Sequence, residues 1–165
     1  MRWKLSWRAD PRALPLADAH YTRQKVGSPQ FVPPGRCLVL LTPCERAYWV
    51  TSWPIAEYVK HAWAGAWVCS AFRNEGAGLS SELITEAVQA TLWKWHAAPE
   101  PHGFVTFVDG TKVKHKRDPG RCFKKAGWTL LKERTKEEGL FVYQLKPCDM
   151  PPPAAPIDAQ GTLFV

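Results

Sequence analysis

The sequence predicts an α/β or α+β protein with a mixed β-sheet of about six or seven strands flanked by helices. Strand-like and helix-like patterns follow one another in the order strand, helix, three strands, long helix, strand, short helix, two strands. Hydrophobic residues make up 45% of the 165 residues, which is enough to form a core. After residue 146 the composition becomes proline-rich and linker-like. We therefore expect one folded domain over residues 1–146 and a flexible tail over residues 147–165.

The first half of the chain is predicted to hold four strands and one helix. Trp3, Leu5 and Trp7 alternate with polar residues, which is the pattern of a short strand. A helix is expected over residues 9–24, with Asp10 as its N-cap. A loop rich in proline and glycine follows. Three apolar runs then predict strands, the third of them buried on both faces, at residues 36–42, 46–53 and 63–72.

The second half begins with the longest helical pattern. Apolar residues recur at helical spacing from Leu79 to Trp95, and the polar residues after Leu79 suit a helix start. A strand follows at residues 103–110. The segment 121–127 predicts a short helix that Gly127 closes. Two final runs, at residues 128–135 and 139–145, predict a hairpin.

Charge and cysteine content narrow the class of protein. The net charge of +7 favours a polyanionic partner, with nucleic acid more consistent than a membrane. The five cysteines contain no C-x-x-C pair, so we expect no structural zinc, and no other set of metal ligands stands out in the sequence. Their odd number argues against a disulfide framework. No segment reads as a signal peptide or a membrane span, which predicts a cytoplasmic protein (in the host cytoplasm if it is phage-encoded).

The stretch "RNEGAG" carries the strongest chemical signal. Arg73, Gly76 and Gly78 lie between a buried strand and the start of the long helix. Glycines at such a point let backbone N–H groups close on a phosphate, and the helix N-terminus adds partial positive charge. The physical prediction is a pyrophosphate cradle. An ordinary strand-to-helix turn is the alternative that glycine spacing alone leaves open.

This stretch resembles the R-x-x-G-x-G coenzyme A loop of the GNAT acyltransferase superfamily, and "RCFKKAGW" resembles a later helix of that family. The resemblance covers residues 1–146 and implies acetyl-CoA as cofactor. It implies that the pantetheine arm lies along the strand and that backbone N–H groups near Ser70 polarise the thioester carbonyl, which gives Ser70 a catalytic role. The implied cofactor-binding residues are Val68, Cys69, Ser70, Ala71, Phe72, Arg73, Asn74, Glu75, Gly76, Ala77, Gly78, Ser80 and Phe123.

Two departures from the GNAT pattern affect the expected chemistry. The helix of that family often carries a tyrosine that protonates the leaving thiolate, whereas this chain has Phe123, which has no proton to donate. The region between the first and second strands also holds one clear helix instead of two. Standard transfer of an acetyl group to an amine is therefore not assured by the resemblance.

The segment "HYTRQ" is expected on the acceptor side of the site. His20, Tyr21 and Arg23 are residue types that stack on a nucleobase and form hydrogen bonds with it, although a helix end with a capping histidine is an equal alternative. The segment also resembles one in phage Mom-type DNA-modification proteins. These are GNAT relatives that convert adenine in DNA to a carbamoylmethyl-type adenine with acetyl-CoA. The resemblance implies a DNA acceptor and a catalytic role for Tyr21.

Two further features belong to this acceptor side. Asp109 ends a predicted strand near the cofactor and is a candidate base, while "DG" is equally a turn signal. The following basic run is a candidate for DNA phosphate contacts, although such runs are usually solvated, and its central cations are Lys114, Lys116 and Arg117.

The tail ends in "QGTLF", which resembles the Q-x-x-L-F pentapeptide by which bacterial polymerases and repair proteins bind the replicative sliding clamp. Gln160 would bond the rim of a pocket that Leu163 and Phe164 fill, and the proline-rich tail would give the motif reach. The alternative is that Leu163 and Phe164 fold back on the domain.

Together these features predict an acetyl-CoA-dependent acyltransferase that modifies DNA bases in a Mom-like way, protecting phage DNA, and that is recruited through a sliding clamp. Two other functions stay open. One is a GNAT enzyme that acetylates a small amine or a protein lysine. The other is a non-catalytic DNA-binding protein with this fold, which the loss of the tyrosine at Phe123 favours.

Overall fold

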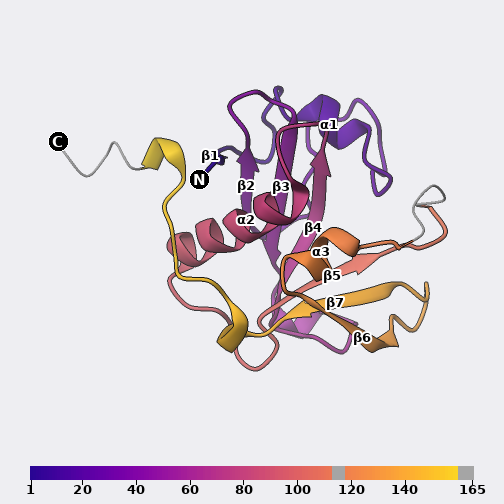
Figure 1. Ribbon diagram of the computed structural model, residues 1–165. Coiled ribbons are helices and arrows are strands. Elements are labelled where there is room, and N and C mark those ends of the chain that lie inside the picture. Colours follow the sequence, from indigo (N-terminus) through magenta and orange to yellow (C-terminus); the bar gives the residue numbers. More distant parts are fainter. Residues whose placement is uncertain (113–117, 160–165) are drawn as a thin grey trace.

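The structure is a computed structural model that describes residues 1–112 and 118–159. The prediction of a mixed sheet flanked by helices is confirmed, and the elements follow the expected order (Figure 1). They are β1 (Lys4–Leu5), α1 (Leu14–Asp18), β2 (Arg36–Leu41), β3 (Ala47–Trp53), the 3-10 turn η1 (Ala56–Tyr58), β4 (Trp67–Asn74), α2 (Ser80–Trp95), β5 (Phe104–Val108), α3 (Arg121–Lys125), β6 (Thr129–Arg134), β7 (Phe141–Leu145) and the 3-10 turn η2 (Pro147–Asp149).

The sheet has seven strands in the order β1-β2-β3-β4-β5-β7-β6. β4 and β5 run parallel, joined by the crossover through α2, while the other neighbouring pairs are antiparallel. Figure 1 shows α2 and α3 on one face of the sheet. On that face the apolar side of α2, which includes Leu83, Ile84 and Val88, packs on the indole rings of Trp49 and Trp67 in one large cluster.

The opposite face carries two smaller apolar clusters. One joins α1 to β2 and β3 and includes Leu16, Val39 and Tyr48. The other lies on β4, β5 and β7 and includes Val68 and Val105. The two clusters share no residue, so this face of the sheet is divided near the middle of β4.

The first helix is much shorter than the predicted span of residues 9–24. α1 begins at Leu14, and residues 7–13 form turns closed by bonds such as that from the Ala13 N–H to the Asp10 carbonyl. Asp10 is therefore not the N-cap of this helix. Its carboxylate is buried and accepts hydrogen bonds from Ser6 and Arg12, which lowers its pKa even though burial alone would raise it.

The proline-rich segment 147–159 also differs from the prediction, because it packs on the domain. The side chain of Gln89 in α2 donates a hydrogen bond to the Pro152 carbonyl, and the backbone carbonyl of Gln89 accepts one from the Ala154 N–H. Further along, the Ile157 N–H donates to the Trp3 carbonyl, and Asp158 accepts from the Leu5 N–H. We call residues 147–159 the strap. In Figure 1 it runs past the left-hand end of α2 toward β1, so the folded domain extends past residue 146.

Candidate functional site

The site lies where β4 stops pairing with β5. β4 pairs with β5 only at Trp67, Val68 and Cys69, although β4 continues to Asn74. Beyond Cys69 the two parallel strands separate, and the edge of β4 that faces β5 is open. A cavity of about 430 Å³, which we call the cleft cavity, lies there. It is lined by residues 19–22, 69–74 and 106–108, and by Ser80, Lys112, Gly120, Cys122 and Phe123.

A β-bulge on β4 lies at the start of this separation. Ala71 pairs with Val50 and Cys69 pairs with Thr51, so Ser70 is the extra residue. A bulged residue is left out of the ladder, and its backbone is free to face a ligand. The Ser70 hydroxyl bonds the Ser52 hydroxyl at 3.0 Å. The bulge therefore sets backbone polar groups at the wall of the cleft cavity, as expected for a site that polarises a carbonyl.

The glycine loop is organised by the side chain of Asn74. Its Oδ1 accepts the N–H groups of Gly76 and Ala77, at 3.1 and 2.9 Å. Its Nδ2 donates to the Gly78 carbonyl and to the Ser80 hydroxyl. Asn74 thus holds the loop in its shape, and the bonds to its side chain engage the Gly76 and Ala77 N–H groups. The glycine pattern did not reveal this role of Asn74.

The backbone N–H groups that can bind an anion lie just after the glycine loop, in the first turn of α2. The first intrahelical bond runs from Leu83 to the Leu79 carbonyl, which leaves the N–H groups of Ser80, Ser81 and Glu82 without helical partners. These groups and the helix dipole favour negative charge. The sequence predicted donors at residues 73–78, whereas the N–H groups without helical partners in the structure are those of residues 80–82.

A second cavity of about 490 Å³ lies at this helix N-terminus, and we call it the helix cavity. It shares Ser80 and Cys122 with the cleft cavity, so the two are contiguous. Arg121 and Lys125 of α3 line it, and the sequence analysis had not assigned them to the site. Guanidinium groups also lie against the glycines, since a Cβ atom would stand 2.8 Å from Arg46 at Gly76 and 2.6 Å from Arg2 at Gly78. Asp118 also lines the helix cavity, and Arg2 is paired with Glu82 and Glu86, so the surroundings of the loop carry charges of both signs.

Arg73 already has partners within the protein. Its Nε pairs with Glu75, and its terminal nitrogen donates to the Ala19 carbonyl, at 3.3 and 3.2 Å. Arg73 therefore ties β4 to the segment after α1 and lines the cleft cavity, whereas the sequence predicted a phosphate contact. Val68 lies in the paired part of β4, in the cluster on the far face, and does not line either cavity.

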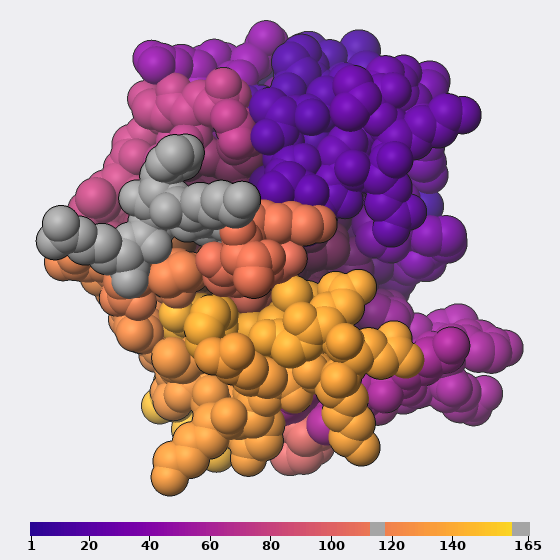
Figure 2. Space-filling view, turned by 90° about the vertical axis from the view of Figure 1, so that its right-hand side faces the viewer, coloured from indigo at the N-terminus to yellow at the C-terminus, as the bar shows by residue number. Residues whose placement is uncertain are grey.

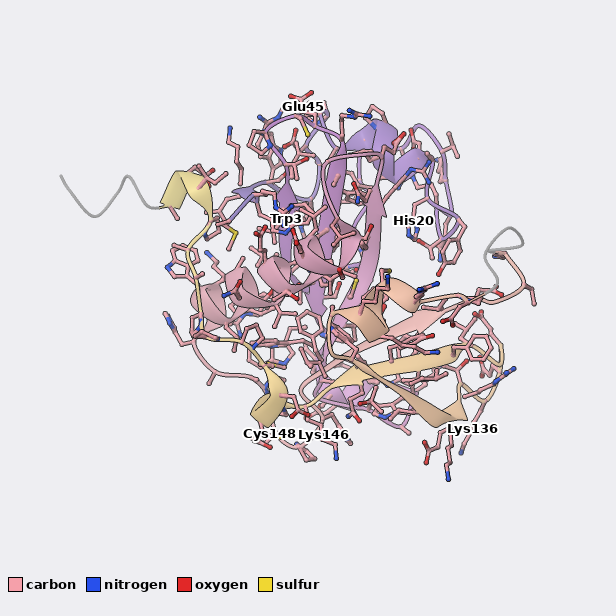
Figure 3. The ribbon with its side chains drawn as sticks, in the orientation of Figure 1. Trp3, His20, Glu45, Lys136, Lys146 and Cys148 are labelled. Atoms are coloured by element: carbon pink, nitrogen blue, oxygen red, sulfur yellow. The ribbon has the colours of Figure 1, made fainter. Side chains whose placement is uncertain are left out.

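His20 and Tyr21 enter the cleft cavity from the loop after α1, and Figure 3 shows His20 beside the outer half of β4. Their rings are stacked, with centroids 4.7 Å apart. Burial and the nearby Arg73 cation lower the pKa of His20 to about 4, so its imidazole is neutral near pH 7. Burial raises the pKa of Tyr21, and a backbone hydrogen bond from Asp109 lowers it in part. The structure thus brings Tyr21 next to Asp109 across the cleft.

Asp109 and Arg23 both have local structural partners. Asp109 accepts from the backbone N–H and the hydroxyl of Thr111, and these bonds lower its pKa, which makes its carboxylate a weak base. Arg23 pairs with Asp18 and donates to the Gln30 and Ser28 carbonyls. Arg23 is nearly buried and fixes the loop after α1, so its guanidinium is engaged within the protein, whereas the sequence predicted a contact with a base.

Phe123 and Cys69 add no ionised group to the cleft. Phe123 is buried and packs on Trp128 and Tyr143, so an aromatic ring without a proton donor fills the position where a tyrosine was expected. Burial raises the pKa of Cys69, which keeps its thiol neutral. Cys122 lies where the cleft and helix cavities meet, a placement the sequence gave no sign of.

The mouth of the cleft can be followed in Figure 2, where the indigo N-terminal loops face the orange residues after β5 and the β6–β7 hairpin lies below. Six residues with predicted roles fall outside the described part of the chain: Lys114, Lys116, Arg117, Gln160, Leu163 and Phe164. Within residues 1–112 and 118–159, His, Cys, Asp and Glu form no group of three suited to a metal ion. The same residues contain no helix with the length and apolarity needed to cross a membrane.

The comparisons with known proteins find no relative for this chain. No protein-family model matches it, and neither a curated protein nor a solved structure shows a significant similarity to it. The function must therefore be argued from the chain itself.

Proposed function

We propose that this protein is a GNAT-type acyltransferase that transfers an acyl group from acetyl-CoA to an amine of a DNA base. The observation that carries the proposal is the open edge of β4, which runs from the bulge at Ser70 into a preformed glycine loop and the N-terminus of α2. A ligand with an extended amide-bearing arm and a pyrophosphate fits this sequence of features. The contiguous cleft and helix cavities give it one path.

The cofactor-binding residues have distinct tasks in this proposal. Ser80 and Ser81 would bind the pyrophosphate with their N–H groups, and Arg121 and Lys125 would add positive charge. The open edge of β4 would pair with the amides of the pantetheine arm, as a sheet edge pairs with an added strand. Acetyl-CoA supplies an activated thioester when bound. The backbone at Ser70 would donate a hydrogen bond to its carbonyl oxygen and stabilise the negative charge that develops there.

The charge of the cleft favours a neutral acceptor over a protonated amine. No carboxylate occurs among the described residues that line the cleft cavity, whereas Arg73 and Lys112 do line it. A lysine or a polyamine would enter as a cation and would be repelled. The exocyclic amine of a nucleobase is uncharged, and the strand that carries it is a polyanion suited to the net charge of +7. This favours a DNA base over the small-amine or lysine alternative.

The weak bases at the cleft indicate catalysis by positioning. Both His20 and Asp109 have lowered pKa values, so neither removes a proton readily near pH 7. The residues that line the cleft cavity would therefore act mainly by holding the amine against the polarised thioester carbonyl. Phe123 keeps the second candidate open, namely a DNA-binding protein that retains the fold without turnover.

Recruitment by a sliding clamp belongs to the same proposal but depends on residues outside the described part of the chain. The contacts of the strap change how the clamp-binding motif would be presented. Because residues 147–159 are bound to α2 and β1, the "QGTLF" motif would be presented from a fixed point instead of from a long flexible tail. A pull-down with purified clamp, comparing wild type with the double variant Leu163→Ala, Phe164→Ala, tests this part.

The cofactor is tested by calorimetry with acetyl-CoA on wild type and Gly76→Asp. An aspartate side chain at Gly76 would meet Arg46, disturb the loop and place negative charge near the pyrophosphate, so we expect affinity to fall about 100-fold or more, on the order of 2.7 kcal/mol. Gly65→Asp is the matched control. Gly65 has nearly the same φ, +91° against +94°, and lies outside the cleft and helix cavities.

Unchanged acetyl-CoA affinity in Gly76→Asp, or an equal loss in Gly65→Asp, would remove the support for the cofactor site. The acceptor is tested separately with isotopically labelled acetyl-CoA and DNA, followed by mass spectrometry of the nucleosides. Label in a modified base is expected. Binding of both acetyl-CoA and DNA without transfer of label would favour the non-catalytic alternative.

A further inference from the structure

A third cavity, of about 450 Å³, lies under the loop that follows α1, and we call it the loop cavity. It shares Thr22, Ser70 and Ala71 with the cleft cavity, so it reaches the same bulge. One part of its wall belongs to the apolar cluster on the face of the sheet away from α2, through Ala17, Val32 and Tyr48, and the rest comes from loop residues between 23 and 34. A group held in the loop cavity would therefore approach Ser70 from a different side than a ligand in the helix cavity.

Tyr48 is the unexplained residue in this cavity. Its side chain is 2% exposed, and it lines the loop cavity from β3. No described residue forms a hydrogen bond with its hydroxyl. Burial raises its pKa, so the phenol is neutral and able both to donate and to accept. Its hydroxyl oxygen is not one of the fully enclosed polar atoms without a partner, which among the described residues are the indole nitrogens of Trp67 and Trp128. The oxygen therefore opens onto the loop cavity, where it can bond a polar ligand group.

The remaining walls fit a flat and uncharged ligand. The ring of Phe31 packs edge to face against Tyr48, with centroids 6.0 Å apart, and adds an aromatic surface. Gln24 and Gln30 line the cavity with amide groups, which can both donate to and accept from a base edge. No carboxylate lines it among the described residues, while Lys25 does. A cationic ligand is therefore disfavoured, and an attached phosphate is tolerated.

We propose that the loop cavity holds a single unstacked nucleobase, with the Tyr48 hydroxyl bonded to its polar edge. This inference rests on the proposed function, because it places the acceptor base of that reaction. A base inside a duplex cannot reach a buried tyrosine, so the base must be unpaired or extruded from the helix. The strand backbone would stay outside, near Lys25, and the base amine would face the bulge at Ser70.

The test uses a single-stranded oligonucleotide that carries the fluorescent adenine analogue aminopurine, titrated with protein in the absence of acetyl-CoA. Wild type should bind it with a rise in fluorescence as the base leaves the stack. Tyr48→Phe should bind about three- to tenfold more weakly, which is the effect of one neutral hydrogen bond. Tyr58→Phe, which removes a hydroxyl from an exposed tyrosine on η1, is the matched control and should bind like wild type.

Thermal unfolding of the same variants separates recognition from structure. Because the Tyr48 hydroxyl has no described protein partner, Tyr48→Phe should melt at the wild-type temperature or slightly above it. A clearly lower melting temperature would show that the hydroxyl serves the fold and would overturn the inference. Equal oligonucleotide binding by wild type and Tyr48→Phe, or no binding by wild type, would also overturn it.

Acetyl-CoA affinity of Tyr48→Phe distinguishes this inference from the proposed function. If wild type binds the oligonucleotide through Tyr48 but does not bind acetyl-CoA, the acyltransfer proposal fails and the base site stands. If acetyl-CoA binds to both proteins and Tyr48→Phe has no effect on the oligonucleotide, the base site fails and the cofactor site stands.

Discussion

The two faces of the sheet are filled in different ways. Under α2 one apolar cluster runs without interruption from Trp3 to Leu145, whereas the opposite face holds two clusters. The loop cavity borders one of these clusters and meets the cleft cavity at Ser70 and Ala71. A continuous core stabilises the fold, and a divided face leaves room for ligands. The position of the candidate site thus depends on the gap between the two apolar clusters, as well as on the residues that line the cavities.

The largest effect is expected from Trp49→Ala, on the filled face. Trp49 is fully buried, contacts the rings of Phe72 and Phe104, and donates to the Thr51 hydroxyl. Its removal should cost about 3–5 kcal/mol of unfolding free energy, measured by urea denaturation. Val50→Ala, one residue along on the divided face, should cost less because fewer contacts are lost. Equal costs would mean that the two faces do not differ in packing.

A smaller effect is expected from acid, through His20 on the divided face. The pKa of His20 is about 4 in the fold and about 6.5 when unfolded, so between these values the unfolded chain binds a proton that the folded chain does not. Stability should therefore fall as the pH falls from 7 to 5, by about 1–2 kcal/mol after allowance for partial exposure.

His20→Gln should lose less stability over the same pH range, since glutamine does not titrate. Arg73→Gln, which removes the repelling cation, should reduce the loss by a smaller amount. Urea denaturation at pH 7 and pH 5 measures both variants. If all three proteins respond alike, His20 is solvated and the divided face is more open than the structure indicates.

The smallest effect is expected at the strap. Asp158→Ala removes one exposed hydrogen bond, to the Leu5 N–H, and should cost about 0.5–1.5 kcal/mol. Acetyl-CoA affinity should stay unchanged, because the strap lies away from the cleft in Figure 1 and no residue of it lines the cleft or helix cavity. Thermal unfolding and calorimetry on the same sample decide this. A loss of affinity would couple the strap to the site.

The order of elements was predictable because periodicity is local. The apolar spacing of α2 and the turn formed by Gly127 need only neighbouring residues. The site was partly predictable for the same reason, since Gly76 and Gly78 lie in one short loop. The separation of β4 from β5 was not, because it depends on pairing between residues such as Cys69 and Thr106 that are distant in sequence.

Other errors have similar causes. Proline content suggested a free tail, but Gln89 and the backbone of Trp3 supply partners that composition cannot show. The residue type of Arg23 suggested a contact with a base, but Asp18 and two carbonyl groups accept hydrogen bonds from its guanidinium. The place of Tyr48 at the loop cavity depends on how residues 22–34 fold over β3, which local sequence patterns do not show.

The strap has a consequence for the two ends of the sheet. β1 is one outer strand, and its Trp3 carbonyl and Leu5 N–H are bonded by strap residues, so another chain cannot easily add a strand there. The other outer strand, β6, pairs with no second strand within residues 1–112 and 118–159 and carries Lys132, Glu133 and Arg134. Charged side chains discourage strand addition by a different route. The chain therefore protects one end of its sheet against aggregation with its own backbone and the other with charge.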